Sequence, residues 1–146
     1  MSEAALLRWQ FRLVHQSQDA VFDTLLVQEH APYARVTVCE DLIINGVLAG
    51  GKPLALSTWR GQTGLSELPP LTTPTEWRAW ASRVRIHPLS FRAYVSAVHA
   101  STDAYLAELD TDRCGETNIR VLVALLLKVS MTHAELAGLQ TACRDS

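Results

Sequence analysis

Two polar residues interrupt a long apolar run near the C-terminus, in the stretch "KVSMTHAELAGL". At about 100° per residue, one helical stripe of this region consists of Val121, Leu125, Val129, Thr132, Leu136, Leu139 and Cys143. We therefore expect Thr132 to face the core, with Lys128 and Glu135 along the edge of the stripe. An ammonium group there can neutralise a buried carboxylate, or its stem can cover the stripe while the charge reaches water.

A carboxylate interrupts an earlier apolar segment in the same way. The apolar face of this segment consists of Val36, Ile43 and Val47, with Ile44 and Leu48. Glu40 lies in the middle of the stripe, and Thr37 borders the same face. Since a buried charge is costly unless it is paired, Glu40 either reaches water at the end of the bundle or meets a cation from another helix. Lys128 is the natural candidate for that cation.

Other polar groups point to chemistry less specifically. The stretch "SRVRIH" can hold a phosphate or a carboxylate, or form a solvated face, with Arg83, Arg85 and His87. Three histidines are far apart in sequence without i,i+4 pairing, so a metal site would need them to meet in the tertiary structure: His15, His30 and His99. The three cysteines lack the CxxC spacing, which argues against a disulfide framework and against a thiolate zinc site.

The spacing of apolar residues predicts a mostly helical chain with four principal helices and one short helix. The expected helices cover Glu3 to Gln28, Pro32 to Gly50, Thr73 to Ile86 (the short one), His87 to Asp110, and a last segment after "CGETN" to about Cys143. The expected N-caps are Ser2, Thr75, and Thr117 or Asn118. The apolar seam of the fourth segment consists of Phe91, Tyr94, Val95, Val98, Thr102, Tyr105 and Leu109.

The connection from Lys52 to Thr73 is rich in Gly, Pro, Ser and Thr, and it is long for a compact domain. Its length suggests a crossover that lets the second and third principal helices lie parallel.

Composition and length limit the classes of function. The 146 residues match one domain, 1–146, with a single core. With 48% hydrophobic and 19% charged residues the composition is that of a soluble globular protein, and a net charge of −2 gives no reason to expect a nucleic acid or a membrane as partner. Because Glu3 and Arg8 lie where a signal peptide would be apolar, we expect a cytoplasmic location.

Three segments of the chain resemble, in this order, the second, third and fourth helices of the DinB/YfiT-like superfamily of four-helix-bundle proteins. The segments are "VTVCEDLIINGVLAG", "FRAYVSAVHASTDAYLAELD" and "KVSMTHAELAGLQ". The resemblance covers most of the chain and is weakest across Lys52 to Arg85. It implies an all-α, DinB-like four-helix bundle with a long crossover connection between helices two and three and a short extra helix.

The same resemblance assigns positions to a site. The family often shows His-x-x-Glu in its second helix and His-x-x-x-His-x-Gly-Glu-Ile in its fourth. Thr37 and Glu40 take the second-helix positions, Lys128 and Thr132 replace the two fourth-helix histidines, and Glu135 matches the glutamate. All three metal-binding histidines are thus replaced. The resemblance implies a degenerate site in which these five residues line a ligand pocket and the Lys128 ammonium takes the place of the metal ion.

Some members of the family are metal-dependent thiol transferases. Without the histidines we expect no metal cofactor, and a non-catalytic role in small-molecule binding or interaction. The alternative is a thiol (S-)transferase or hydrolase that binds zinc or nickel through other ligands, for instance Glu40, Glu135 and a histidine from another helix. A third reading is a structural homodimer with no ligand pocket. We expect a homodimer because the first helix carries apolar residues on more than one face, with Phe22 and Leu26 beside the main stripe.

Overall fold

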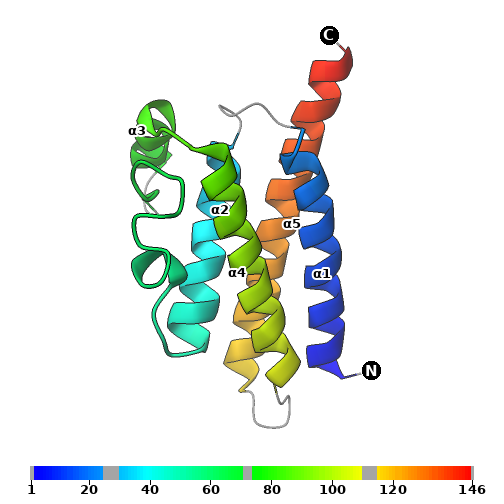
Figure 1. Cartoon of the computed structure of the whole chain (residues 1–146). Coiled ribbons are helices and arrows are strands. Elements are labelled where there is room, and N and C mark those ends of the chain that lie inside the picture. The colour runs from blue at the N-terminus through cyan, green and yellow to red at the C-terminus, as the bar shows by residue number, and fades with distance from the viewer. Residues whose placement is uncertain (1, 25–29, 71–73, 110–114, 146) are drawn as a thin grey trace. The chain divides into compact units, whose positions relative to one another are not determined.

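The structure of the chain is a computed structural model that describes residues 2–24, 30–70, 74–109 and 115–145, with side chains described up to residue 134. Across these ranges the protein contains five α-helices and no strand (Figure 1). One isolated antiparallel bridge joins Leu65 to Ile86. The predicted all-α fold class is therefore confirmed for the described part of the chain.

The chain divides into two compact units. We call residues 26–102 the central unit, and residues 1–25 together with 103–146 the terminal unit. Helix α4 (Pro88–Glu108) begins in the central unit and ends in the terminal unit. The expectation of one domain over 1–146 stays a prediction.

In the terminal unit, α1 (Glu3–Phe22) and α5 (Glu116–Asp145) lie side by side and run in the same direction (Figure 1). The buried side chains of this unit include Leu7, Phe11, Leu106, Leu122, Leu125 and Val129. A buried glutamine joins the two helices, because the Gln18 amide donates a hydrogen bond to the carbonyl oxygen of Val129 at 3.2 Å. Apolar side chains and one polar bond hold this pair together.

The ends of these helices agree only in part with the sequence. Ser2 caps α1 as predicted, since its Oγ accepts a hydrogen bond from the Ala5 N–H at 3.1 Å. The described helix ends at Phe22, and the predicted end at Gln28 lies outside the described residues. Helix α5 begins at Glu116, so the predicted caps Thr117 and Asn118 lie inside it. The Gly115 carbonyl instead accepts the first helical hydrogen bonds.

In the central unit, α2 (Ala31–Asp41) starts one residue before the predicted Pro32 and continues directly as a π-helix, Leu42–Leu48. Gly50 follows with a φ of 70°, at the predicted end. The predicted apolar face of this helix is wrong at Val47, which is 71% exposed, and is confirmed at Ile44, which is fully buried. The i→i+5 hydrogen bonds of a π-helix rotate later residues away from the faces that a 3.6-residue period assigns.

The long connection contains one short 3-10 helix, Leu54–Leu56, within its described residues 52–70. The short helix α3 (Pro74–Arg83) follows, and Thr75 lies inside it rather than at its cap. Helix α4 begins at Pro88, one residue after the predicted start at His87, because the residue before a proline is disfavoured in a helix. In Figure 1, α2 and the first part of α4 lie side by side in the central unit, and both run from the top of the view to the bottom.

Two tryptophans anchor α3 within the central unit. Trp80 is fully buried, its indole N–H donates to the carbonyl oxygen of Glu67 at 3.0 Å, and its ring stacks on that of Trp77 at 5.2 Å. The Arg35 guanidinium of α2 lies 4.9 Å from the Trp77 ring centroid. This short helix is therefore held by aromatic packing.

Across the described residues, none of the helices combines the length and the apolar character that crossing a membrane requires.

Candidate functional site

The two site residues predicted on α2 are buried one helical turn apart. Thr37 is 3% exposed and Glu40 is 2% exposed, although both are polar. All residues from Val36 to Asp41 are buried, so this part of α2 is enclosed on every side. A helix in that position is normally apolar all round, which makes the polar residues informative.

The predicted residues of α5 belong to the terminal unit. The Lys128 side chain is exposed, and Thr132 is half-buried with its hydroxyl donating to the Lys128 carbonyl oxygen at 3.0 Å. Glu135 lies in α5, and its side chain is outside the described residues. The meeting of these residues with Thr37 and Glu40, and the predicted ion pair between Lys128 and Glu40, stay predictions.

Within the central unit, α4 supplies polar neighbours for Glu40. The Thr102 Oγ1 lies 2.7 Å from Oε2 of Glu40 and 3.2 Å from the carbonyl oxygen of Val98. A hydroxyl has one proton, and the shorter, charge-assisted bond to the carboxylate is the stronger one. An imidazole nitrogen of His99 lies within 4.8 Å of a carboxylate oxygen of Glu40. Since His99 and Thr102 are three residues apart, one face of α4 carries both groups.

Asp41, the residue after Glu40, joins the long connection between α2 and α3 to the helices of the central unit. It is 0% exposed, and each of its carboxylate oxygens accepts two hydrogen bonds. Oδ1 accepts from the Asn45 amide (2.8 Å) and the Leu54 N–H (2.7 Å), and Oδ2 accepts from the Ala55 N–H (2.9 Å) and the Tyr94 hydroxyl (2.7 Å). This carboxylate therefore ties α2, the π-helix, the 3-10 helix and α4 together.

The Tyr94 hydroxyl reports the electrostatics of this region. Its pKa is raised far above the ordinary value, first by burial, then by the charge of Asp41 and the hydrogen bond to it, and last by the charge of Glu40. Tyr94 consequently remains protonated and is a permanent donor to Asp41. Two adjacent buried carboxylates, one of them within reach of an imidazole, are a setting for a cation.

A second carboxylate cluster lies in the terminal unit. Asp103 accepts bidentate hydrogen bonds from the guanidinium groups of Arg8 (2.9 and 3.0 Å) and Arg12 (2.7 and 3.1 Å). These bonds, the one from Arg8 first, hold the pKa of the Asp103 carboxyl well below its usual range. The same bond raises the pKa of Arg8. Unlike Asp41, this carboxylate is already paired with cations, so it gives no reason to expect a bound ion.

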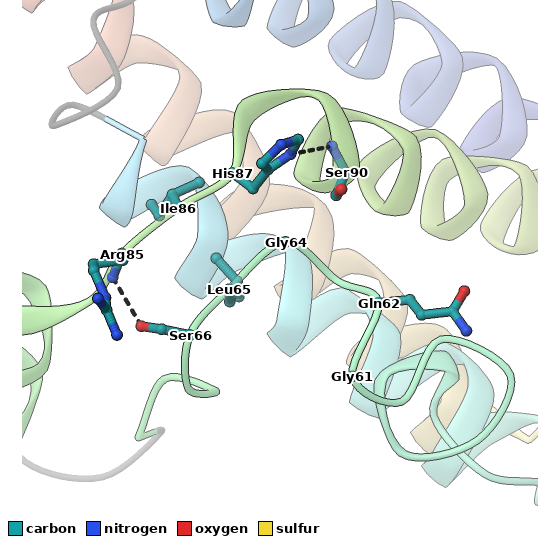
Figure 2. A pocket seen from close by; sticks show the side chains of 9 residues that line it. All are labelled: Gly61, Gln62, Gly64, Leu65, Ser66, Arg85, Ile86, His87 and Ser90. Carbon is teal, nitrogen blue, oxygen red and sulfur yellow. Dashed lines mark hydrogen bonds between the residues drawn. The ribbon is translucent and has the colours of Figure 1, made fainter.

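The stretch "SRVRIH" lies on a solvated face, one of the two alternatives, since Arg83, Arg85 and His87 are exposed. The Arg83 side chain pairs with Glu67, and the His87 Nδ1 accepts a hydrogen bond from the Ser90 N–H at 3.3 Å. Arg85 borders a surface depression of about 440 Å³ lined by Gly61, Gln62, Gly64, Leu65, Ser66, Arg85, Ile86, His87 and Ser90. In Figure 2 the polar side chains of Arg85, His87 and Gln62 point in different directions. They do not converge on one ligand position.

Sequence reasoning missed Asp41 and set His99 aside. It placed Tyr94 and Thr102 only in the apolar seam of α4, although both hydroxyls face carboxylates of α2. One signal was present: the seam contains a threonine where a leucine would pack better, three residues after a histidine. Polar residues inside two apolar stripes are an indication that the stripes face each other.

The arrangement in the central unit can hold a small cationic group through Glu40, with His99 as a second polar contact and Thr102 orienting the carboxylate. Comparisons with known protein families, with curated proteins and with solved structures gave no match to this chain.

Proposed function

We propose that this chain is a DinB-like protein with a degenerate metal site, which binds a small ligand or serves in interaction and catalyses no reaction. The ligand site is built on the buried polar positions of α2, Thr37 and Glu40. The protein acts in the cytoplasm.

The observation that carries this proposal is the burial of Thr37 and Glu40 together. Moving a carboxylate out of water costs several kcal/mol, which is on the order of the net stability of a whole domain. A helix that only needed packing would carry apolar residues at both positions. Retaining a threonine and a glutamate one turn apart is typical of a site that holds a polar ligand.

We propose a four-helix bundle with a crossover as the architecture. It is supported by the four principal helices and by the short α3. It is also supported by the common direction of α2 and α4, which precede and follow the long connection in the chain. A parallel pair of this kind needs a connection that returns along the length of the helices.

Thermal unfolding with a ligand panel tests the binding role. Metal-stripped protein is heated with divalent metal ions, small amines and low-molecular-weight thiols. A ligand at 100 times its dissociation constant raises the unfolding midpoint by about 5–10 °C. We expect Thr37→Val and Glu40→Gln to abolish the shift, and the matched control Thr58→Val, at an exposed threonine of the same unit, to keep it. A shift that survives both α2 substitutions would contradict the proposal.

The alternative is a metal-dependent thiol transferase, which the nearness of His99 to Glu40 favours. Incubating the protein with zinc or nickel, a low-molecular-weight thiol and an electrophile, and measuring the conjugate by mass spectrometry, separates the two roles. We expect no conjugate above the rate in buffer. Conjugation that Glu40→Gln removes would establish the alternative instead.

We also propose that the protein forms a homodimer through α1. The face of α1 opposite its buried stripe carries three exposed apolar residues: Leu6, Trp9 and Leu13. Exposed apolar residues at this spacing are typical of a helix that packs against a partner. Light scattering should give twice the chain mass, and Trp9→Ser with Leu13→Lys should give the chain mass. A wild-type protein that stays monomeric at high concentration would refute the dimer.

A further inference from the structure

A buried hydrogen bond of the central unit joins α2 and α4 at Glu40 and Thr102, and His99 lies beside it. Glu40 is 2% exposed, and its Oε2 accepts a hydrogen bond of 2.7 Å from the Thr102 hydroxyl. Carboxylates that bind metal ions are characteristically held by such a hydrogen bond, which fixes the rotamer and leaves the remaining lone pairs directed at the ion. Glu40 therefore has the support that a metal ligand needs.

His99 supplies the second ligand from the same face of α4 as Thr102. One of its ring nitrogens lies within 4.8 Å of a carboxylate oxygen of Glu40. Two ligand atoms bonded at about 2.0–2.2 Å to one tetrahedral zinc ion are about 3.4 Å apart. Binding of one ion by both groups would bring the two atoms to about that separation.

The charge around this pair favours a cation. Asp41 follows Glu40 in α2, is 0% exposed, and accepts four hydrogen bonds from neutral donors: the Asn45 amide, the Tyr94 hydroxyl and two backbone N–H groups. Two adjacent buried carboxylates repel each other and are costly to keep ionised. A divalent cation at Glu40 offsets this repulsion, since it carries two positive charges.

We infer that Glu40 and His99 are two protein ligands of a divalent transition-metal ion of the zinc–nickel class. This inference rests on the proposed binding function and names the ligand. It follows the alternative in which a metal ion binds through ligands other than the family's histidines. The ion would then lie at Glu40 and His99 and would not involve Lys128 or Thr132. An imidazole beside a carboxylate suits zinc, nickel and cobalt, whereas magnesium and calcium prefer ligand sets made of oxygen.

The test uses the full chain after removal of metals with a chelator. Zinc is titrated by calorimetry, and cobalt binding is followed by its visible absorption, which reports coordination by nitrogen and oxygen. We expect about one ion per chain for the wild type, and affinity at least about tenfold weaker for His99→Ala and for Glu40→Gln. The control His87→Ala removes an exposed histidine just before the same helix and should bind as the wild type does.

Folding of each variant is checked by circular dichroism. Should Glu40→Gln unfold, Thr102→Val replaces it, because it removes the hydrogen bond to the carboxylate and leaves both ligands present; we expect about tenfold weaker binding. Loss of binding in an alanine variant at another histidine of the chain would identify a third ligand and support the site. Wild-type protein without zinc or cobalt binding at 100 times the protein concentration would overturn the inference, as would His99→Ala binding like the wild type.

These outcomes separate the inference from the proposed function. If an amine or a thiol, and no metal ion, raises the unfolding midpoint in a way that depends on Thr37 and Glu40, the metal inference fails and the binding role stands. If metal ions bind independently of His99 but need Glu40, the assignment of His99 is wrong. If the wild type binds nothing in the panel, both fail.

Discussion

Asp41 in the central unit and Asp103 in the terminal unit use the same acceptor geometry in opposite surroundings. In both carboxylates each oxygen accepts two hydrogen bonds, at 2.7–2.9 Å for Asp41 and 2.7–3.1 Å for Asp103. The donors of Asp41 are neutral groups and its residue is 0% exposed. The donors of Asp103 are two guanidinium groups, and its side chain is 28% exposed.

This difference shows that the number of hydrogen bonds to a carboxylate does not determine how much they contribute to the free energy of folding. Around Asp103, water can solvate any group that loses its partner, so the cluster contributes little to the free energy of folding. Around Asp41, a lost partner leaves donors buried and unsatisfied. The buried cluster therefore organises the fold, whereas the exposed cluster mainly sets the charge and the acid dependence of its surface.

The same substitution at both positions should give the largest contrast. In Asp41→Asn the amide NH₂ replaces an oxygen that accepts two bonds, so in either orientation two buried or part-buried donors face another donor. At about 1–3 kcal/mol for each unsatisfied donor, we expect a loss of about 3 kcal/mol or more in the free energy of unfolding. Asp103→Asn should lose about 1 kcal/mol or less. Denaturation in urea measures both; equal losses would contradict the comparison.

A smaller effect isolates one partner of the buried cluster. Tyr94→Phe removes the hydroxyl that donates to Asp41 and leaves the ring packed, so we expect a loss of about 1.5–3 kcal/mol, the usual value for a hydrogen bond to a charged group. In the Asp41→Ala background the same substitution should cost much less, because its acceptor is gone. Urea denaturation of the double-mutant cycle measures this coupling, and additive losses would show that the bond contributes nothing.

The smallest expected effect is an acid dependence that belongs to Asp103. Its folded pKa lies below the unfolded value of about 3.9, so its contribution to stability is present above that pH and is lost as the pH falls through the folded pKa. The difference in midpoint between wild type and Asp103→Asn should therefore shrink below about pH 4. At pH 7 it should shrink when salt is raised to about 1 M, because exposed charges are screened. If the difference in unfolding midpoint stayed constant from pH 7 to pH 2, the ion pairs would not be its cause.

Much of the helical content could be predicted from the sequence, because the signals are local. Pro88 marks the start of α4, Ser2 caps α1, and Gly50 ends the helical segment that begins with α2. In each case the chemistry of one residue decides the backbone: a fixed φ, a side-chain acceptor, or freedom to adopt positive φ. The caps predicted at Thr75 and Thr117 failed because other residues one or two positions earlier start those helices.

The site could be predicted only in part. Polar residues within apolar stripes identified Thr37 and Glu40, both of which are buried. The roles of His99 and Asp41 could not be predicted, because each depends on contacts across more than ten residues of chain. The π-helix after Asp41 could not be predicted either, because the sequence pattern of a π-helix does not differ from that of an α-helix. The exposure of Val47 could therefore not be predicted.

The sequence by itself determined that the chain is helical, approximately where the helices lie, and that polar residues interrupt their apolar faces. Periodicity, caps and breakers act within a few residues, so no tertiary contact is needed to read them. Only the tertiary structure decided that Asp41 gathers four donors and that His99 reaches Glu40. Helical periodicity shows which side of a helix is buried, but the partner across that side depends on the packing of α2 against α4, which brings together residues more than fifty positions apart in the chain.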